Sequence, residues 1–97
     1  MIKEKSVLVL GVGPDQGLGV ALCKQFAEEG YKVFGCGRSK ENMDALKNIK
    51  VSKGSIEGIV GDVTNPEDVS NIFSTLDKLG VKLESVIYNA GNNLSLI

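Results

Sequence analysis

The stretch Val7-Leu8-Val9-Leu10-Gly11-Val12-Gly13-Pro14-Asp15-Gln16-Gly17-Leu18-Gly19 decides the fold, because a short apolar run leads directly into a turn that holds four glycines. The run from Ser6 to Leu10 is rich in β-branched residues and leucine, which is typical of a strand buried on both faces. Glycine and proline then predict a loop. We expect a strand, a tight glycine turn and the start of a helix.

The rest of the chain repeats this alternation of strand and helix. A first helix is expected from Leu18 to Glu29, ended by Gly30. A second strand is expected at Val33 to Cys36, a third at Gly58 to Val63 and a fourth at Leu83 to Tyr88. The apolar residues that mark the face of the first helix are Leu18, Ala21, Leu22 and Phe26.

Two further helices are marked by their capping residues. Ser39 is a candidate N-cap for a weaker second helix, whose end the sequence does not define. Asn65 or Thr64 caps a third helix with Pro66 at its first position, and Gly80 ends it. The second helix carries Met43, Leu46 and Ile49, and the third has the cleanest apolar face, Val69, Ile72, Phe73, Leu76 and Leu79.

The resulting order, β-α-β-α-β-α-β, predicts one α/β domain over residues 1–97, a doubly wound parallel sheet of Rossmann type. The net charge of -1 gives no field that would gather nucleic acid or an anionic membrane. No apolar stretch approaches the roughly 20 residues of a membrane span. Cys23 and Cys36 form no CxxC pair and are interpreted as small apolar residues in a reducing compartment, so we expect a cytoplasmic protein.

The glycine turn is the first candidate site, because helix N-terminal amides and the helix dipole favour a phosphate there. The dehydrogenase fingerprint GxGxxG would need a glycine where Gln16 lies, and GxxxGxG fits better, with Gly13, Gly17 and Gly19. Gly11 is an alternative first glycine. A plain tight turn without a ligand is the other interpretation.

Four separated places together resemble the short-chain dehydrogenase/reductase family. The turn resembles that family's TGxxxGxG, Asp62-Val63 its adenine-contacting Asp-Val, and Asn89-Ala90-Gly91 its Asn-Asn-Ala-Gly; Arg38 is the fourth place. All four follow successive strands, where open α/β sheets bind ligands. Val12 and Tyr88 depart from the family pattern, and a turn that starts at Gly11 looks like the enoyl-thioester reductase branch.

The residues after the second strand predict the cofactor. An acid there would bind the ribose of NAD, but Arg38 and Ser39 are found instead, and a guanidinium suits a 2′-phosphate. We therefore expect NADP(H) rather than NAD(H), unless Arg38 is only a solvated side chain. The full set of candidate cofactor-binding residues is Gly11, Gly13, Gln16, Gly17, Leu18, Gly19, Arg38, Ser39, Asp62, Val63, Asn89, Ala90 and Gly91.

The later motifs have less specific interpretations as well. Asp62 would accept a hydrogen bond from the adenine amino group, with Val63 against the ring, yet Asp62 could equally start an Asx turn before Pro66. Asn89, Ala90 and Gly91 would line the ribose on the nicotinamide side, or form only a turn.

The resemblance implies a Tyr-x3-Lys pair for catalysis, and none occurs, because Tyr31 is followed at that spacing by Gly35 and Tyr88 by Asn92. No catalytic residue and no metal ligand is assigned, and we expect the catalytic residues beyond Ile97. The resemblance thus implies the cofactor-binding half of an NADP(H)-dependent oxidoreductase that acts on a small carbonyl or alcohol substrate.

The alternatives to this function are a non-catalytic nucleotide-sensing module and an α/β domain that binds no nucleotide.

The family's strand order, 3-2-1-4, would leave residues 86–88 on an open apolar edge. Assembly with a second copy of the chain stays an open expectation.

Overall fold

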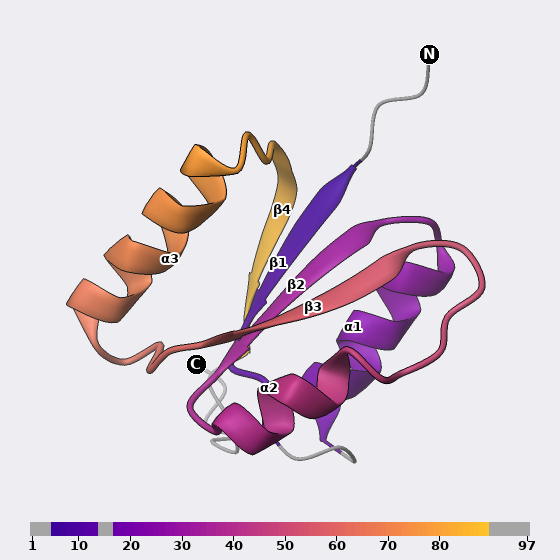
Figure 1. Ribbon diagram of the computed structural model, residues 1–97, viewed down its shortest axis with the longest axis horizontal. Helices are drawn as coiled ribbons and strands as arrows, with labels where there is room; N and C mark the ends of the chain where they lie inside the picture. Colours follow the sequence, from indigo (N-terminus) through magenta and orange to yellow (C-terminus); the bar gives the residue numbers. More distant parts are fainter. Residues whose placement is uncertain (1–4, 14–16, 90–97) are drawn as a thin grey trace, which may run out of the picture.

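A four-stranded parallel sheet forms the centre of the molecule (Figure 1). The computed structural model describes residues 5–13 and 17–89. The strands are β1 (Ser6–Leu10), β2 (Lys32–Gly37), β3 (Ser55–Val60) and β4 (Leu83–Tyr88), and their spatial order is β3-β2-β1-β4. This is the predicted half of a doubly wound Rossmann-type sheet.

The helices cover both faces of the sheet. The first two, α1 (Leu18–Glu28) and α2 (Lys40–Leu46), lie on one face, and α3 (Pro66–Lys78) lies on the other (Figure 1). Side chains of β1 alternate between the two layers: Val7 and Val9 belong to the core under α1 and α2, whereas Leu8 and Leu10 belong to the core under α3. All five residues of β1 are buried, as its apolar composition predicts.

The predicted apolar face of α1 is only partly right, because Leu22 and Phe26 pack against the core whereas Leu18 and Ala21 are exposed. The side chains that α1 buries are Val20, Cys23 and Ala27, together with Gly19. Leu22 and Phe26 are only partly buried at the flank of this core, and Leu18 is 65% exposed. The prediction chose the face by the spacing of its large apolar side chains. The face that packs on the sheet is instead made of smaller residues, which allow α1 to lie close to the strands.

The predicted bounds of two elements also need correction. We expected the third strand at 58–63, but β3 spans Ser55–Val60. Its register with β2 sets both bounds, because Ser55 pairs with Lys32, the first residue of β2, and Val60 with Gly37, the last. Asp62 and Val63 therefore follow the strand. The second helix ends at Leu46, and Ile49 reaches the core from the turn that follows.

The predicted cap of α2 is confirmed, and of the two residues expected to cap α3, Asn65 does so and Thr64 does not. The Ser39 hydroxyl accepts a hydrogen bond from the Asn42 amide at 3.1 Å, and the Asn65 side chain accepts from the amides of Glu67 and Asp68 at 2.9 and 3.4 Å. Gly80, with φ of 75°, follows the end of α3. The face of α3 is confirmed in part, because Ile72 and Leu76 are buried while Leu79 is 66% exposed.

Among the described residues, the strand β4 forms one edge of the sheet. Val86 and Tyr88, which are 45% and 56% exposed, pair with Leu8 and Leu10 and so share their face, the side that α3 covers elsewhere. Ile87 points to the opposite face and packs against the core under α1 and α2. The predicted apolar edge is thus present for Val86 and Tyr88, but Ile87 is part of the core.

Candidate functional site

Backbone hydrogen bonds bring the carboxyl ends of three strands together. The amides of Gly11 and Val12, just after β1, both donate to the carbonyl of Cys36 in β2, at 2.8 and 2.7 Å. The Gly61 amide, just after β3, donates to the Gly37 carbonyl at 2.8 Å. The glycine turn, Arg38 and Asp62 therefore follow the carboxyl ends of three neighbouring strands, as the strand order predicts.

The glycines of the turn have different roles. Gly11 has φ of 96° and lies against the Asn89 backbone, and a methyl group on Gly19 would lie 2.9 Å from both the Gly11 oxygen and the Val12 Cα. Gly11 and Gly19 therefore permit close backbone packing. Gly13 has no described atom within 4 Å of the place of a Cβ, so the described residues leave its side of the turn open.

The N-terminus of α1 differs from those of α2 and α3. Its N-cap is Gly17, which has no side chain to accept from the first amides, and its first turn contains no acid. The helices α2 and α3 have side-chain caps and carry Glu41 or Glu67 and Asp68 in their first turns. The start of α1 thus leaves the positive end of its dipole without a carboxylate in the described residues.

Asn89 ties the end of β4 to the glycine turn. Its backbone amide donates to the Leu10 carbonyl at 2.7 Å, and its side-chain Nδ2 donates to the Gly11 carbonyl at 2.9 Å. This partly buried side chain therefore fixes the backbone on which the turn begins. Its predicted place beside a ribose is an expectation that these contacts leave open.

Arg38 is an exposed side chain directly after β2. The Ser39 hydroxyl beside it uses an oxygen lone pair for the cap of α2, so its hydrogen is free to donate. Hydrogen bonds from the Thr64 hydroxyl and amide, and to a smaller extent the charge of Arg38, lower the pKa of the Asp62 carboxyl.

Asp62 does form the Asx-type turn that we considered as its alternative. Its Oδ1 accepts from the Thr64 amide at 2.9 Å and from the Thr64 hydroxyl at 2.6 Å. Its own amide donates to the Asp68 carboxylate at 2.8 Å. Because only Oδ1 is used in these bonds, the turn and an acceptor role for Oδ2 are compatible. Val63, half-buried, packs against the core under α3.

A cavity of about 170 Å³ adjoins the turn, lined by Gly13, Val20, Asn42, Ala45, Leu46, Asn48 and Ile49. A larger one, of about 610 Å³, lies at the opposite end of the sheet beside Lys5, Lys32 and Lys82. Only the smaller cavity is part of the candidate site, because the predicted residues follow the carboxyl ends of the strands.

Three predicted site residues, Gln16, Ala90 and Gly91, lie outside the described residues. Sequence reasoning missed Thr64 and Asp68, which hold Asp62 in place. It also missed Gly37, where a methyl group would meet the Val12 carbonyl oxygen. The spacing Asp-x-Thr could have signalled the contact between Asp62 and Thr64. The bond to Asp68 depends on the path of the chain from β3 to α3, which no local pattern reports.

Both cysteines are free and buried, as expected of small core residues. Burial raises the pKa of the Cys23 thiol to about 11. Burial, and then the nearby Asp68 and Asp62 carboxylates, raise that of Cys36 to about 11. Neither thiol is an activated nucleophile.

Comparison with protein families identifies this arrangement. The family model described as short chain dehydrogenase matches residues 5–96, which is nearly the whole chain. The chain belongs to the short-chain dehydrogenase family. Proteins of this family bind nicotinamide dinucleotides.

Individual short-chain dehydrogenase relatives agree with this assignment. An uncharacterized oxidoreductase of Staphylococcus aureus (strain USA300) is 34% identical over 95 residues, covering 98% of this chain and 40% of the relative. An NADPH-dependent pterin aldehyde reductase of Arabidopsis thaliana is 33% identical over 92 residues, covering 94% of this chain and 37% of the relative. The chain thus spans about 40% of the length of the relatives it matches. Within the described residues, no helix has the length and apolar character to traverse a bilayer.

Proposed function

We propose that this chain binds NADP(H) at the carboxyl ends of β1, β2 and β3, as the cofactor-binding part of a short-chain oxidoreductase. The proposed reaction of the whole protein is hydride transfer to or from a small carbonyl or alcohol substrate. The cofactor, when bound, supplies or accepts the hydride. The observation that carries the proposal is the convergence of the open glycine turn, Arg38 and Asp62 at one sheet edge.

The glycine turn fits a pyrophosphate. The space beside Gly13 would let a phosphate oxygen come within hydrogen-bond distance of the backbone, and no acid occupies the first turn of α1 to repel it. Gly17 and Leu18, at the start of α1, would present their amides to the same group. In this proposal the backbone binds the shared diphosphate and does not distinguish between the two dinucleotides.

Arg38 would make that distinction. Its guanidinium would pair with the 2′-phosphate, and the Ser39 hydroxyl would donate a second hydrogen bond. No acid takes the place where NAD-binding proteins hold the free 2′-hydroxyl. The NADPH dependence named for the Arabidopsis relative is in keeping with this choice.

Asp62 and Asn89 would orient the two ends of the cofactor. The unused Oδ2 of Asp62 would accept from the adenine amino group, with Val63 beside the ring. Asn89, followed by Ala90 and Gly91, would lie toward the nicotinamide end. Because the side chain of Asn89 is already bonded to Gly11, its contribution there would be to hold the turn in place.

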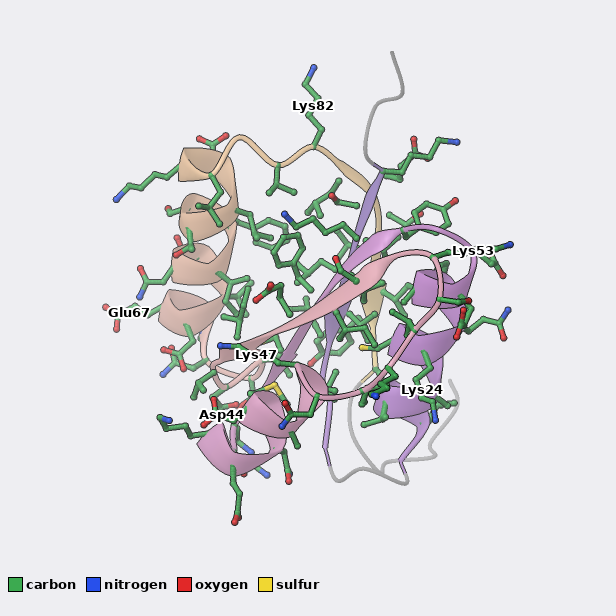
Figure 2. The ribbon with its side chains drawn as sticks, turned by 45° about the vertical axis from the view of Figure 1, so that its right-hand side comes forward. Lys24, Asp44, Lys47, Lys53, Glu67 and Lys82 are labelled. Carbon is green, nitrogen blue, oxygen red and sulfur yellow. The ribbon has the colours of Figure 1, made fainter. Side chains whose placement is uncertain are left out.

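Titration of the protein with NADPH and with NADH tests the proposal. We expect the unaltered protein to bind NADPH at least about tenfold more tightly, because a charge-assisted hydrogen bond contributes about 1.5–3 kcal/mol. Arg38→Ala should abolish this preference by weakening only NADPH binding. Lys53→Ala is the matched control: it removes the same charge from the loop before β3, at the other end of the sheet (Figure 2). Equal affinity of the unaltered protein for the two dinucleotides would refute the role of Arg38, and binding of neither would refute the proposed function.

A further inference from the structure

Asp68 makes a hydrogen bond that its own helix does not require. It lies in the first turn of α3, and its Oδ2 accepts from the Asp62 amide at 2.8 Å. The amides at the start of α3 already bond to the Asn65 side chain. Asp68 is half-buried, whereas Glu67 beside it is exposed and points away from the sheet (Figure 2). The Asp68 carboxylate therefore faces the segment that leaves β3.

The Asp62 amide is the first one after β3 without a partner in the sheet. Gly61 is still held to β2, because its amide donates to Gly37 and its carbonyl accepts from the Cys36 thiol at 3.6 Å. Beyond Gly61 the chain turns away, and the Asp68 carboxylate takes the place of the sheet as acceptor. The contact thus determines where the backbone of Asp62 lies.

The Asp62 side chain is oriented from its other end. Both bonds from Thr64 reach Oδ1, and no described residue donates to Oδ2. With its amide held by Asp68 and its Oδ1 held by Thr64, the carboxylate has a defined direction. A ligand that donates a hydrogen bond to this oxygen binds more tightly when the oxygen is already held in place.

We propose that Asp68 is a positioning residue for the adenine end of the cofactor: it holds the Asp62 backbone so that the free carboxylate oxygen meets the adenine amino group. This inference rests on the proposed function. Asp68 itself contacts no part of the cofactor. It acts by fixing the segment between β3 and α3, so its removal affects adenine recognition and leaves the diphosphate and 2′-phosphate contacts in place.

The test compares NADPH with its hypoxanthine analogue, which has a carbonyl oxygen where adenine has the amino group. The unaltered protein should bind NADPH about tenfold more tightly than the analogue, because the analogue opposes an acceptor to Asp62. Asp68→Ala should reduce this ratio to about two or less. Asp68→Asn, which keeps an acceptor oxygen in the same place, should restore most of it.

Glu67→Ala is the matched control, since it also removes a first-turn acid from α3 but no contact with Asp62; its ratio should stay at that of the unaltered protein. If Asp68→Ala does not fold, Asp68→Ser carries the same expectation, because its side chain is one bond shorter and keeps a polar group in the turn. A ratio in Asp68→Ala or Asp68→Ser equal to that in Glu67→Ala overturns the inference and leaves the proposed function intact. Failure of the unaltered protein to bind NADPH overturns both.

Discussion

Replacement of Gly13 by alanine tests whether this glycine serves the proposed cofactor binding and not the fold. The added methyl group would meet no described atom within 4 Å, and Gly13 is not among the residues with positive φ. The free energy of unfolding should therefore change by less than about 0.5 kcal/mol. A phosphate oxygen, however, must come within about 2.9 Å of the backbone amides, and the methyl group would hold it away.

The expected loss of affinity follows from the bonds that the methyl group prevents. Loss of one charge-assisted hydrogen bond costs about 1.5–3 kcal/mol, so the Kd for NADPH should rise about tenfold to a hundredfold. The intrinsic fluorescence of the reduced nicotinamide ring reports NADPH binding, because its excitation lies outside the absorption of protein side chains. Urea unfolding followed by circular dichroism measures stability on the same samples.

Gly37→Ala provides the contrast. A methyl group there would meet the Val12 carbonyl oxygen and would lie 2.9 Å from Met43 Cε, so we expect a loss of about 2–3 kcal/mol of stability. Should Gly13→Ala bind NADPH as tightly as the unaltered protein, the pyrophosphate does not approach this side of the turn and our reasoning is wrong.

Three further predictions follow from contacts at and near the site. Asn89→Ala should cost about 1–2 kcal/mol in urea unfolding by removing the bond to the Gly11 carbonyl, and Asn89→Asp should cost more because it opposes two acceptors; equal stability of all three proteins would contradict the contact. At about pH 8 an aromatic disulfide reagent should label neither Cys23 nor Cys36 in the folded protein but both in urea, since burial raises each pKa to about 11; rapid labelling without urea would show that the thiols are accessible. The folded-state pKa of Asp62 lies below its ordinary value of 3.8, so this group stabilises the fold above that pH and the contribution is lost as the pH falls; Thr64→Val should flatten the acid limb of the stability curve, and an unchanged limb would contradict the assignment.

The fold was largely predictable because its signals are local. The buried strand from Ser6 to Leu10, the Asn65 cap with Pro66, and Gly80 each specify an element through neighbouring residues alone. The end of β3 was not predictable in the same way. It depends on pairing with β2, and the apolar residue Val63 extends the pattern of a strand past Val60, which pairs with the last residue of β2.

The candidate site divides along the same line. Arg38 and the glycines could be placed from motifs, because the ends of parallel strands lie at one edge. The two hydrogen bonds from Thr64 to Asp62, and the bond from the Asp62 amide to Asp68, could not be predicted from motifs. They depend on the directions of side chains in the segment that follows β3. The face of α1 was predicted only in part for a related reason: burial of Val20 and Cys23 is set by how closely the helix approaches β1, which leucine spacing does not report.

The Cys36 carbonyl, which accepts from both Gly11 and Val12, lies only two residues before Arg38. The start of the glycine turn and the exposed guanidinium are therefore joined through one short piece of backbone. Because the junction uses main-chain atoms, exchange of the side chain at position 38 could retune dinucleotide preference while the architecture that presents it stays the same.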